Sequence, residues 1–270
     1  MEIIILPDAE CAARLTSLLI ADQVRGKPDS VLGLATGRTM ERVYALLVSL
    51  HRDEGLDFSL CHTFNLDEYI GVAPEDEHSY RHYMNDRFFR AINIDILNSH
   101  LPDGMAGDIK TACRAYEDAI RACGGIDLQL LGIGVSGHIG FNEPLSAMRS
   151  RTRDKTLTPE TRRQNAAMFG GDVNRVPSRA ITMGVGTILE ARKLVVLVTG
   201  EEKADMLARA VEGPVTSRVS ASAIQWHEDC CVVVDEAAAS RLEGHTYYRW
   251  VFANEPDWRV YRARLGMTPE

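Results

Sequence analysis

"IDLQLLGIGVSGHIGFNEP", residues 126–144, joins an apolar run to a glycine-rich loop, and the way this junction is interpreted decides the fold prediction. The run 126–133 has the length and apolar content of a buried strand. Residues 132–137 then fit the G-x-G-x-x-G spacing that opens a helix in dinucleotide-binding proteins. Here Gly140 and Pro144 follow within a few residues and disrupt a regular helix. The stretch therefore predicts a buried strand followed by an irregular loop.

A dinucleotide site also needs an acidic residue about 20 positions after its glycines, at the end of a second strand. Only Asp154 stands near that distance, and it lies in the polar run "RTRDKT". We therefore rank an oxidoreductase last among the functions considered. The loop instead presents His138 and Glu143 at the end of a strand.

The rest of the chain alternates apolar runs of strand length with longer segments of helical period. Further strands are predicted at 2–6, 30–35, 60–65, 193–199 and 230–235. Helices are predicted at 8–25, with Asp8 as the N-cap, and at 38–53, 79–92, 109–123 and 200–213. This alternation is typical of an α/β fold with a doubly wound, mostly parallel sheet and helices on both faces. We predict one Rossmann-like domain over 1–270.

One segment interrupts the alternation. Residues 147–177 are polar and rich in arginine, and they end in "GGDVNRVP". A polar stretch of this length inside an α/β protein is more often functional than decorative, although surface decoration is the alternative. We predict that 147–177 forms a lid.

Composition narrows the class of protein. The chain has 270 residues, 45% hydrophobic and 25% charged, which is typical of a soluble protein. A formal net charge of -8 argues against a broad basic surface for nucleic acid or an anionic membrane. The start, "MEIIILPDAE", has neither the basic residues nor the apolar length of a secretory signal. We expect a cytoplasmic protein.

The six cysteines show neither a C-x-x-C pair nor zinc-ligand spacing with histidine. We expect reduced thiols and no metal site. Cys230 and Cys231 lie in the apolar run "CCVVVD" and are predicted to be strand residues.

Polar residues follow three of the predicted strands, and ligands of open parallel sheets bind at such strand ends. Residues 36–39, "TGRT", lie between a strand and a helix and could cradle a phosphate, or could simply shape and cap the turn. Asp67 and Glu68 follow the next strand, where a carboxylate could cap a helix or act as a general base. His138, with Glu143 nearby, suits proton transfer near neutral pH.

Six stretches together resemble the glucosamine-6-phosphate deaminase family, in order and over nearly the whole chain. They are "LGLATGRT", "TFNLDEY", "LLGIGVSGHIGFNEP", "SRTRDKTLT", "DVNRVPSRAITMGVGTIL" and "LVTGEEKADMLARAVEG". The resemblance implies conversion of glucosamine 6-phosphate and water into fructose 6-phosphate and ammonia, without a metal or organic cofactor. It also implies that His138, supported by Glu143, opens the sugar ring, and that Asp67 moves a proton from C2 to C1.

The resemblance implies binding residues as well. The substrate and its phosphate would be held by Thr36, Gly37, Arg38, Thr39, Gly137 and Lys203. Hexameric bacterial members are activated by N-acetylglucosamine 6-phosphate, through residues matching Ser146, Arg153, Lys155 and Thr156. The resemblance thus implies a homo-oligomer, in particular a hexamer, with a possible effector site.

Three positions depart from the family pattern. Ser136 stands where the family has Asp or Asn in the ring-opening relay, Arg38 replaces a glycine of the phosphate loop, and Ala167 aligns with a lid arginine. A serine carries no charge to stabilise a protonated histidine, so ring opening is the step most affected. Two alternatives follow: a deaminase for a different amino-sugar phosphate, or a sugar-phosphate sensor with weakened catalysis.

Overall fold

The computed structural model describes residues 1–267, so the last three positions of the predicted domain 1–270 lie outside the described residues. Its main strands are β1 (Glu2–Leu6), β2 (Val31–Leu34), β3 (His62–Asn65), β5 (Ser99–His100), β6 (Leu128–Leu131), β9 (Lys193–Val198) and β10 (Cys230–Asp235). They form one parallel sheet in the order β1-β10-β9-β6-β2-β3-β5. All six predicted strands lie in this sheet, and Cys230 and Cys231 are buried strand residues, as predicted.

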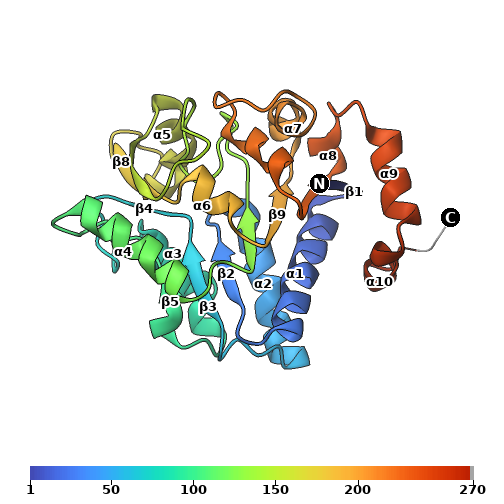
Figure 1. Ribbon diagram of the computed structural model, residues 1–270, viewed down its shortest axis with the longest axis horizontal. Coiled ribbons are helices and arrows are strands. Elements are labelled where there is room, and N and C mark those ends of the chain that lie inside the picture. The colour runs from blue at the N-terminus through green and yellow to red at the C-terminus, as the bar shows by residue number, and fades with distance from the viewer. Residues whose placement is uncertain (268–270) are drawn as a thin grey trace.

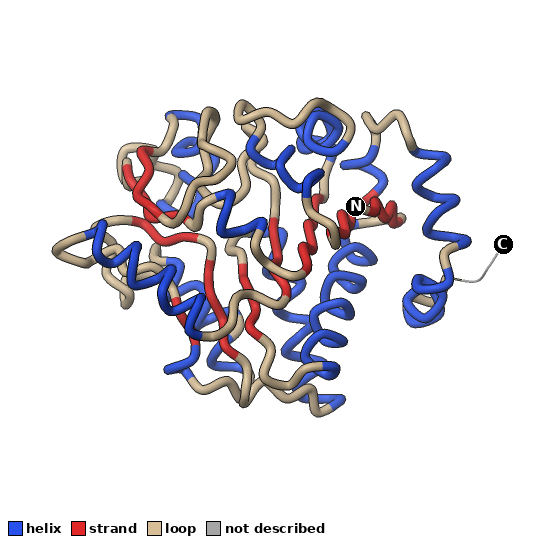
Figure 2. The backbone as a smooth tube through the Cα atoms, in the orientation of Figure 1, coloured by secondary structure: helices blue, strands red, loops and turns tan. Residues whose placement is uncertain are grey.

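Helices surround the sheet, so the predicted α/β architecture is confirmed (Figures 1 and 2). They are α1 (Ala9–Gly26), α2 (Arg38–Glu54), α3 (Tyr80–Arg87), α4 (Ile109–Ala122), α5 (Pro159–Asn165), α6 (Val185–Leu189), α7 (Ala204–Val211), α8 (Glu236–Ala239), α9 (His245–Asn254) and α10 (Arg259–Arg264). Asp8 caps α1 as predicted, because its side chain accepts a hydrogen bond from the backbone N–H of Cys11 at 2.7 Å. No helix within residues 1–267 is long and apolar enough to cross a membrane.

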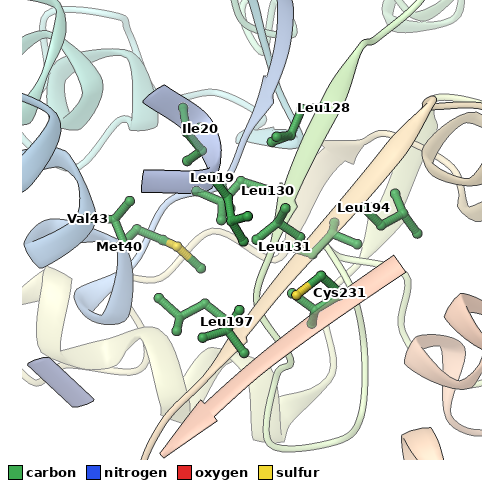
Figure 3. Packing of buried hydrophobic residues seen from close by; sticks show 14 of the residues in the cluster. Leu19, Ile20, Met40, Val43, Leu128, Leu130, Leu131, Leu194, Leu197 and Cys231 are labelled. Atoms are coloured by element: carbon green, nitrogen blue, oxygen red, sulfur yellow. The ribbon is translucent and has the colours of Figure 1, made fainter. Parts of the chain in front are cut away.

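The main core consists of buried side chains of the seven-stranded sheet and of the helices packed on it, among them α1, α2, α4, α7 and α9. Figure 3 shows Leu19 and Ile20 of α1 and Met40 of α2 packed near Leu130 of β6 and Leu197 of β9. Apart from Gln129 of β6 and Lys193 of β9, these strands are apolar, because they are covered by helices on both faces. The core thereby fixes the strand ends from which the polar loops emerge.

A second, smaller sheet was not predicted. It consists of β4 (Asp67–Tyr69), β8 (Arg179–Thr182) and β7 (Arg153–Thr156), paired antiparallel in the order β4-β8-β7, and it lies at upper left in Figure 1. Asp67 and Glu68 follow β3, as predicted, and are themselves the first two residues of β4. The segment 147–177 likewise contains β7 and α5, so it is more regular than its polar sequence indicated.

The strand order explains why distant polar segments meet. From β2 the chain adds β3 and β5 on one side, then returns to place β6, β9 and β10 on the other. The order reverses between β2 and β6, which is the topological switch point where ligands of open α/β sheets bind. The strands β9, β6, β2 and β3 are consecutive neighbours, so the loops that follow them gather at one edge.

Candidate active site

The loop after β6 holds His138 between two oxygen groups. Its Nδ1 lies 2.6 Å from the Oγ of Ser136 and 3.6 Å from Oε2 of Glu143. His138 and Glu143 are buried, with 7% and 3% of their surface exposed. Burial lowers the pKa of His138, the Lys203 cation lowers it further, and the Glu143 carboxylate opposes both effects. The imidazole is therefore neutral at neutral pH, and its proton affinity depends on Glu143.

Two glycines, Gly134 of the G-x-G-x-x-G stretch and Gly140 after it, leave space for side chains of the site. A Cβ on Gly134 would lie 2.1 Å from Nε2 of His138, so only glycine leaves room for the imidazole ring. A Cβ on Gly140 would lie 2.8 Å from Oγ1 of Thr182 and 3.5 Å from Oδ2 of Asp67. Within the described chain no helix begins between β6 and β7. The structure thus favours the loop interpretation over a dinucleotide turn.

The adjacent acids Asp67 and Glu68 have different surroundings. Glu68 accepts hydrogen bonds from the backbone N–H groups of Tyr69, Tyr80 and Arg81 at 2.9–3.0 Å, so it anchors the start of α3. Asp67 is 7% exposed, and burial, followed by the charge of Glu68, raises its pKa to about 8. A carboxylate with a pKa near the working pH suits general-base catalysis. Asp67 is therefore the candidate base, and Glu68 is structural.

The loop 36–39 lies at the N-terminus of α2, as predicted. Gly37 is the N-cap, and Arg38 and Thr39 begin the helix. Two tyrosine hydroxyls fix the loop: Tyr44 donates to the carbonyl of Ala35 at 2.6 Å and Tyr83 donates to the carbonyl of Gly37 at 2.9 Å. Thr36 is partly buried, whereas Arg38 is exposed.

Arg38 and Thr39 line a cavity of about 300 Å³ between α1, α2 and the end of β9. Its other lining residues are Ala9, Glu10, Ala13, Arg42, Leu197 and Thr199. Arg42 is paired with Glu10 at 2.5 Å, which leaves Arg38 as the cation of this cavity that can face an anion.

Lys203 ends a short 3₁₀ turn, Glu201–Lys203, after β9, and burial lowers its pKa. Its effect on the pKa of His138 places its charge near the catalytic loop. Gly137 lies in the same loop, and its carbonyl accepts a hydrogen bond from the N–H of Ala221 at 3.0 Å. Gly137 directly precedes His138, and the charge of Lys203 acts on the pKa of that histidine.

The predicted effector residues are distributed over the loop and β7. Ser146 is buried in the loop, while Arg153, Lys155 and Thr156 belong to β7. Nη1 of Arg153 donates to Oδ1 of Asn142 at 2.8 Å, which links β7 to the residue next to Glu143. A second cavity, of about 340 Å³, lies between Arg153 and α4.

Sequence reasoning missed Thr158, whose N–H and hydroxyl bind Oε1 of Glu143 at 3.0 and 3.2 Å. Thr158 is the N-cap of α5 and precedes Pro159, a pattern that predicts a helix start. That pattern could have identified the cap, but not its contact with a residue 15 positions earlier.

Comparisons with known proteins identify the family. A family model described as glucosamine-6-phosphate isomerases/6-phosphogluconolactonase matches residues 9–233. The chain belongs to this family.

Within the family, the chain is 48% identical to the glucosamine-6-phosphate deaminase of Streptomyces coelicolor over 259 residues, 96% of this chain and 99% of that protein. It is also 48% identical to the glucosamine-6-phosphate deaminase of Shewanella loihica, over 98% of each chain. A solved structure described as a monomeric glucosamine-6-phosphate deaminase superposes with a TM-score of 0.87 at 41% identity, covering 89% of this chain and all of that one. The 6-phosphogluconolactonase from Trypanosoma cruzi, at 18% identity and a TM-score of 0.69, shares the fold.

Proposed function

We propose that the chain converts glucosamine 6-phosphate and water into fructose 6-phosphate and ammonia, a step in amino-sugar breakdown. The observation that carries the proposal is the 48% identity, over nearly the full length of both chains, to proteins named for this activity. The identity to the structures described as 6-phosphogluconolactonases is 16–20%, so the deaminase branch of the family is favoured. The site chemistry fits the same reaction.

Ring opening is assigned to His138, with Glu143 and Ser136. The ring oxygen of the pyranose must gain a proton as its bond to C1 breaks, and the hydroxyl on C1 must lose one. An imidazole performs both transfers near neutral pH, and the negative charge of Glu143 stabilises its protonated form. Ser136 contacts Nδ1, so it orients the ring without adding charge.

Isomerisation is assigned to Asp67. The carboxylate takes the proton from C2 of the open aldose and returns it to C1. The C1 carbonyl oxygen gains a proton and the C2 amine loses one, which leaves a hydroxyl at C1 and an imine at C2. Water adds to this imine and ammonia departs, giving the ketose. A pKa of about 8 leaves a usable fraction of Asp67 ionised at neutral pH and makes it a strong enough base for a proton beside a carbonyl.

Phosphate binding is assigned to Thr36, Gly37, Arg38 and Thr39 at the start of α2, together with Lys203 after β9. The backbone N–H groups at a helix N-terminus attract an anion, and a guanidinium suits a phosphate bidentately. Arg38 begins α2 in this loop, and its guanidinium is assigned the role of the lid arginine that aligns with Ala167.

The test is direct. Purified protein is incubated with glucosamine 6-phosphate, and ammonia and fructose 6-phosphate are measured. Equal amounts of both products support the proposal. Absence of both, with glucosamine 6-phosphate still binding, indicates the sensor alternative. Turnover of another amino-sugar phosphate in place of this one indicates a changed substrate.

We also propose an effector site for N-acetylglucosamine 6-phosphate at Ser146, Arg153, Lys155 and Thr156, and a hexameric assembly. The bond from Arg153 to Asn142 supports the first, because an anion bound to Arg153 would act on the neighbour of Glu143. A solved relative is described as monomeric, which argues against the hexamer. Light scattering decides the assembly, and rates with and without N-acetylglucosamine 6-phosphate decide the activation.

A cytoplasmic location is proposed as well. All six cysteines are free thiols, which a reducing compartment maintains.

A further inference from the structure

The two oxygens of the Glu143 carboxylate have different surroundings. Oε1 accepts hydrogen bonds from the backbone N–H and the hydroxyl of Thr158. Oε2 is buried, has no hydrogen-bond partner within the described residues, and lies 3.6 Å from Nδ1 of His138. The carboxylate group is planar, so holding Oε1 in place also fixes the direction of Oε2.

The donors that fix this orientation come from outside the catalytic loop. Glu143 uses its backbone groups within the loop, where its N–H bonds the carbonyl of Phe141 and its carbonyl accepts from Ser146. Its side chain instead reaches the junction between β7 and α5, where Thr158 is the N-cap. The catalytic carboxylate is therefore oriented by the segment 147–177.

The Thr158 side chain can bond Glu143 and Thr161 at the same time. A hydroxyl has one hydrogen and two acceptor lone pairs. The Thr158 hydroxyl lies 3.2 Å from Oε1 of Glu143 and 3.0 Å from the hydroxyl of Thr161, and its oxygen accepts from the N–H of Thr161 at 3.2 Å. Its hydrogen goes to the charged carboxylate, which is the stronger acceptor, and the Thr161 hydroxyl donates to the Thr158 oxygen. The same side chain thus caps α5 and holds Glu143.

We propose that Thr158 is a positioning residue for ring opening: it holds Glu143 so that Oε2 faces His138, and acts on the reaction through that pair. This inference rests on the proposed function in assigning ring opening to His138. It also means that the His138–Glu143 pair is complete only while the start of α5 lies against the catalytic loop.

The test variant is Thr158→Val, which removes the hydroxyl but keeps the branched shape and the backbone N–H. Because the charge of Glu143 raises the pKa of His138, a displaced carboxylate lowers it. We expect the pKa of His138, followed by NMR titration, to fall. We expect kcat to fall about three- to tenfold with little change in KM. Thr158→Ser restores both values, since it returns the hydroxyl.

Two controls separate positioning from loss of structure. Thr161→Val removes the hydroxyl contact between Thr161 and Thr158 in the same first turn of α5 but leaves the bonds from Thr158 to Glu143, so it is expected to keep the pKa of His138. In a Glu143→Gln background the charge is already absent, so adding Thr158→Val is expected to change neither His138 nor kcat further. An equal loss in both backgrounds overturns the proposal, as does an unchanged His138 pKa in folded Thr158→Val.

The NMR test of Thr158 does not depend on whether glucosamine 6-phosphate is the substrate. The NMR titration reads the link from Thr158 to His138 without turnover. If glucosamine 6-phosphate is not consumed but the titration shifts as expected, the proposed function fails and the positioning role stands.

Discussion

Asp67 and Glu68 are neighbours in sequence, and their spacing alone could not separate a helix cap from a general base. Their surroundings separate them: Glu68 accepts three backbone N–H groups, whereas Asp67 is buried with its pKa raised to about 8. The pKa of Asp67 is 3.8 in the unfolded chain and about 8 in the folded protein. Between pH 3.8 and about pH 8, the folded state therefore holds one more proton than the unfolded state. Stability conferred by Asp67 is therefore present at low pH and is lost as pH rises, by about 1.4 kcal/mol per pH unit at most.

Asp67→Asn tests both roles of this residue. We expect kcat to fall at least about a thousandfold, because the amide cannot take the C2 proton. We also expect the variant to be more stable than the parent, with the difference in melting temperature growing from pH 5 to pH 8. Thermal unfolding at both pH values, with a turnover assay, measures the two effects.

The matched control for stability is Asp154→Asn. Arg179 lowers the pKa of Asp154, so this carboxylate stabilises the fold above pH 3.8 and its loss lowers the melting temperature. The burial argument predicts that the stability advantage of Asp67→Asn over the parent grows as pH rises. An advantage that stays constant or shrinks would contradict it.

Ser136 is the second residue at which a substitution tests the catalytic roles. An aspartate there would place a charge beside Nδ1 of His138, at a position where the serine oxygen lies 2.6 Å away. We expect Ser136→Asp to raise the pKa of His138 and to increase kcat about tenfold, equivalent to ~1.4 kcal/mol in the barrier. The rate and the NMR titration of His138 are compared with those of Ser136→Ala. An unchanged rate in Ser136→Asp would show that a hydroxyl is sufficient for the relay.

Among the elements, α3 depends on a side chain from another strand. Glu68 of β4 accepts from the N–H groups of Tyr80 and Arg81, the first two residues of that helix. We expect Glu68→Ala to lower the free energy of unfolding by about 2–4 kcal/mol, because it leaves buried donors without partners. Urea unfolding measures this loss.

The exposed Glu54 offers a control for removing a carboxylate. It pairs with Arg25 on the surface, where such a pair contributes little, so Glu54→Ala is expected to change stability by less than about 1 kcal/mol. Equal losses in the two variants would show that Glu68 does not anchor α3.

The strands also show which parts of the fold could be predicted from the sequence and which could not. The strands of the main sheet were predictable because runs such as "CCVVVD" are apolar except for the last residue, and their order brings together the segments bearing Asp67, His138 and Lys203. β7 reads "RDKT" and β4 has three residues, so neither has an apolar pattern that marks a strand. Both are strands because they pair with β8, which is a tertiary effect that single-sequence patterns do not contain. The bond from Thr158 to Glu143 was missed for the same reason.

For the whole molecule, the burial of the site has a consequence for substrate entry. Asp67, His138 and Glu143 are each less than 10% exposed, although a phosphorylated sugar must reach them. Part of the chain must therefore move during each turnover. The segment 147–177 is the candidate, since Thr158 binds Glu143 and Gln164 accepts from the N–H of Val135 at 3.4 Å.

An aromatic contact holds this segment against the site. Phe169 is buried, its ring centroid lies 5.5 Å from that of Tyr69 and 4.7 Å from that of His78, and it belongs to a small apolar cluster separate from the main core. Local opening of this cluster costs less than global unfolding, because few residues lose contacts.

Phe169→Ala is expected to make that opening easier. Amide hydrogens in 159–169 should exchange at least about tenfold faster, while those of β6, β9 and β10 keep their rates, since the main core is untouched. We expect KM to rise, because the closed form that retains the sugar is less populated. Phe88→Ala, which cuts into the main core, is the contrasting variant and should speed exchange throughout the sheet. If Phe169→Ala gives that same uniform pattern, or none, then 147–177 is not an independently opening cover, and access to Asp67 and His138 must come from another part of the chain.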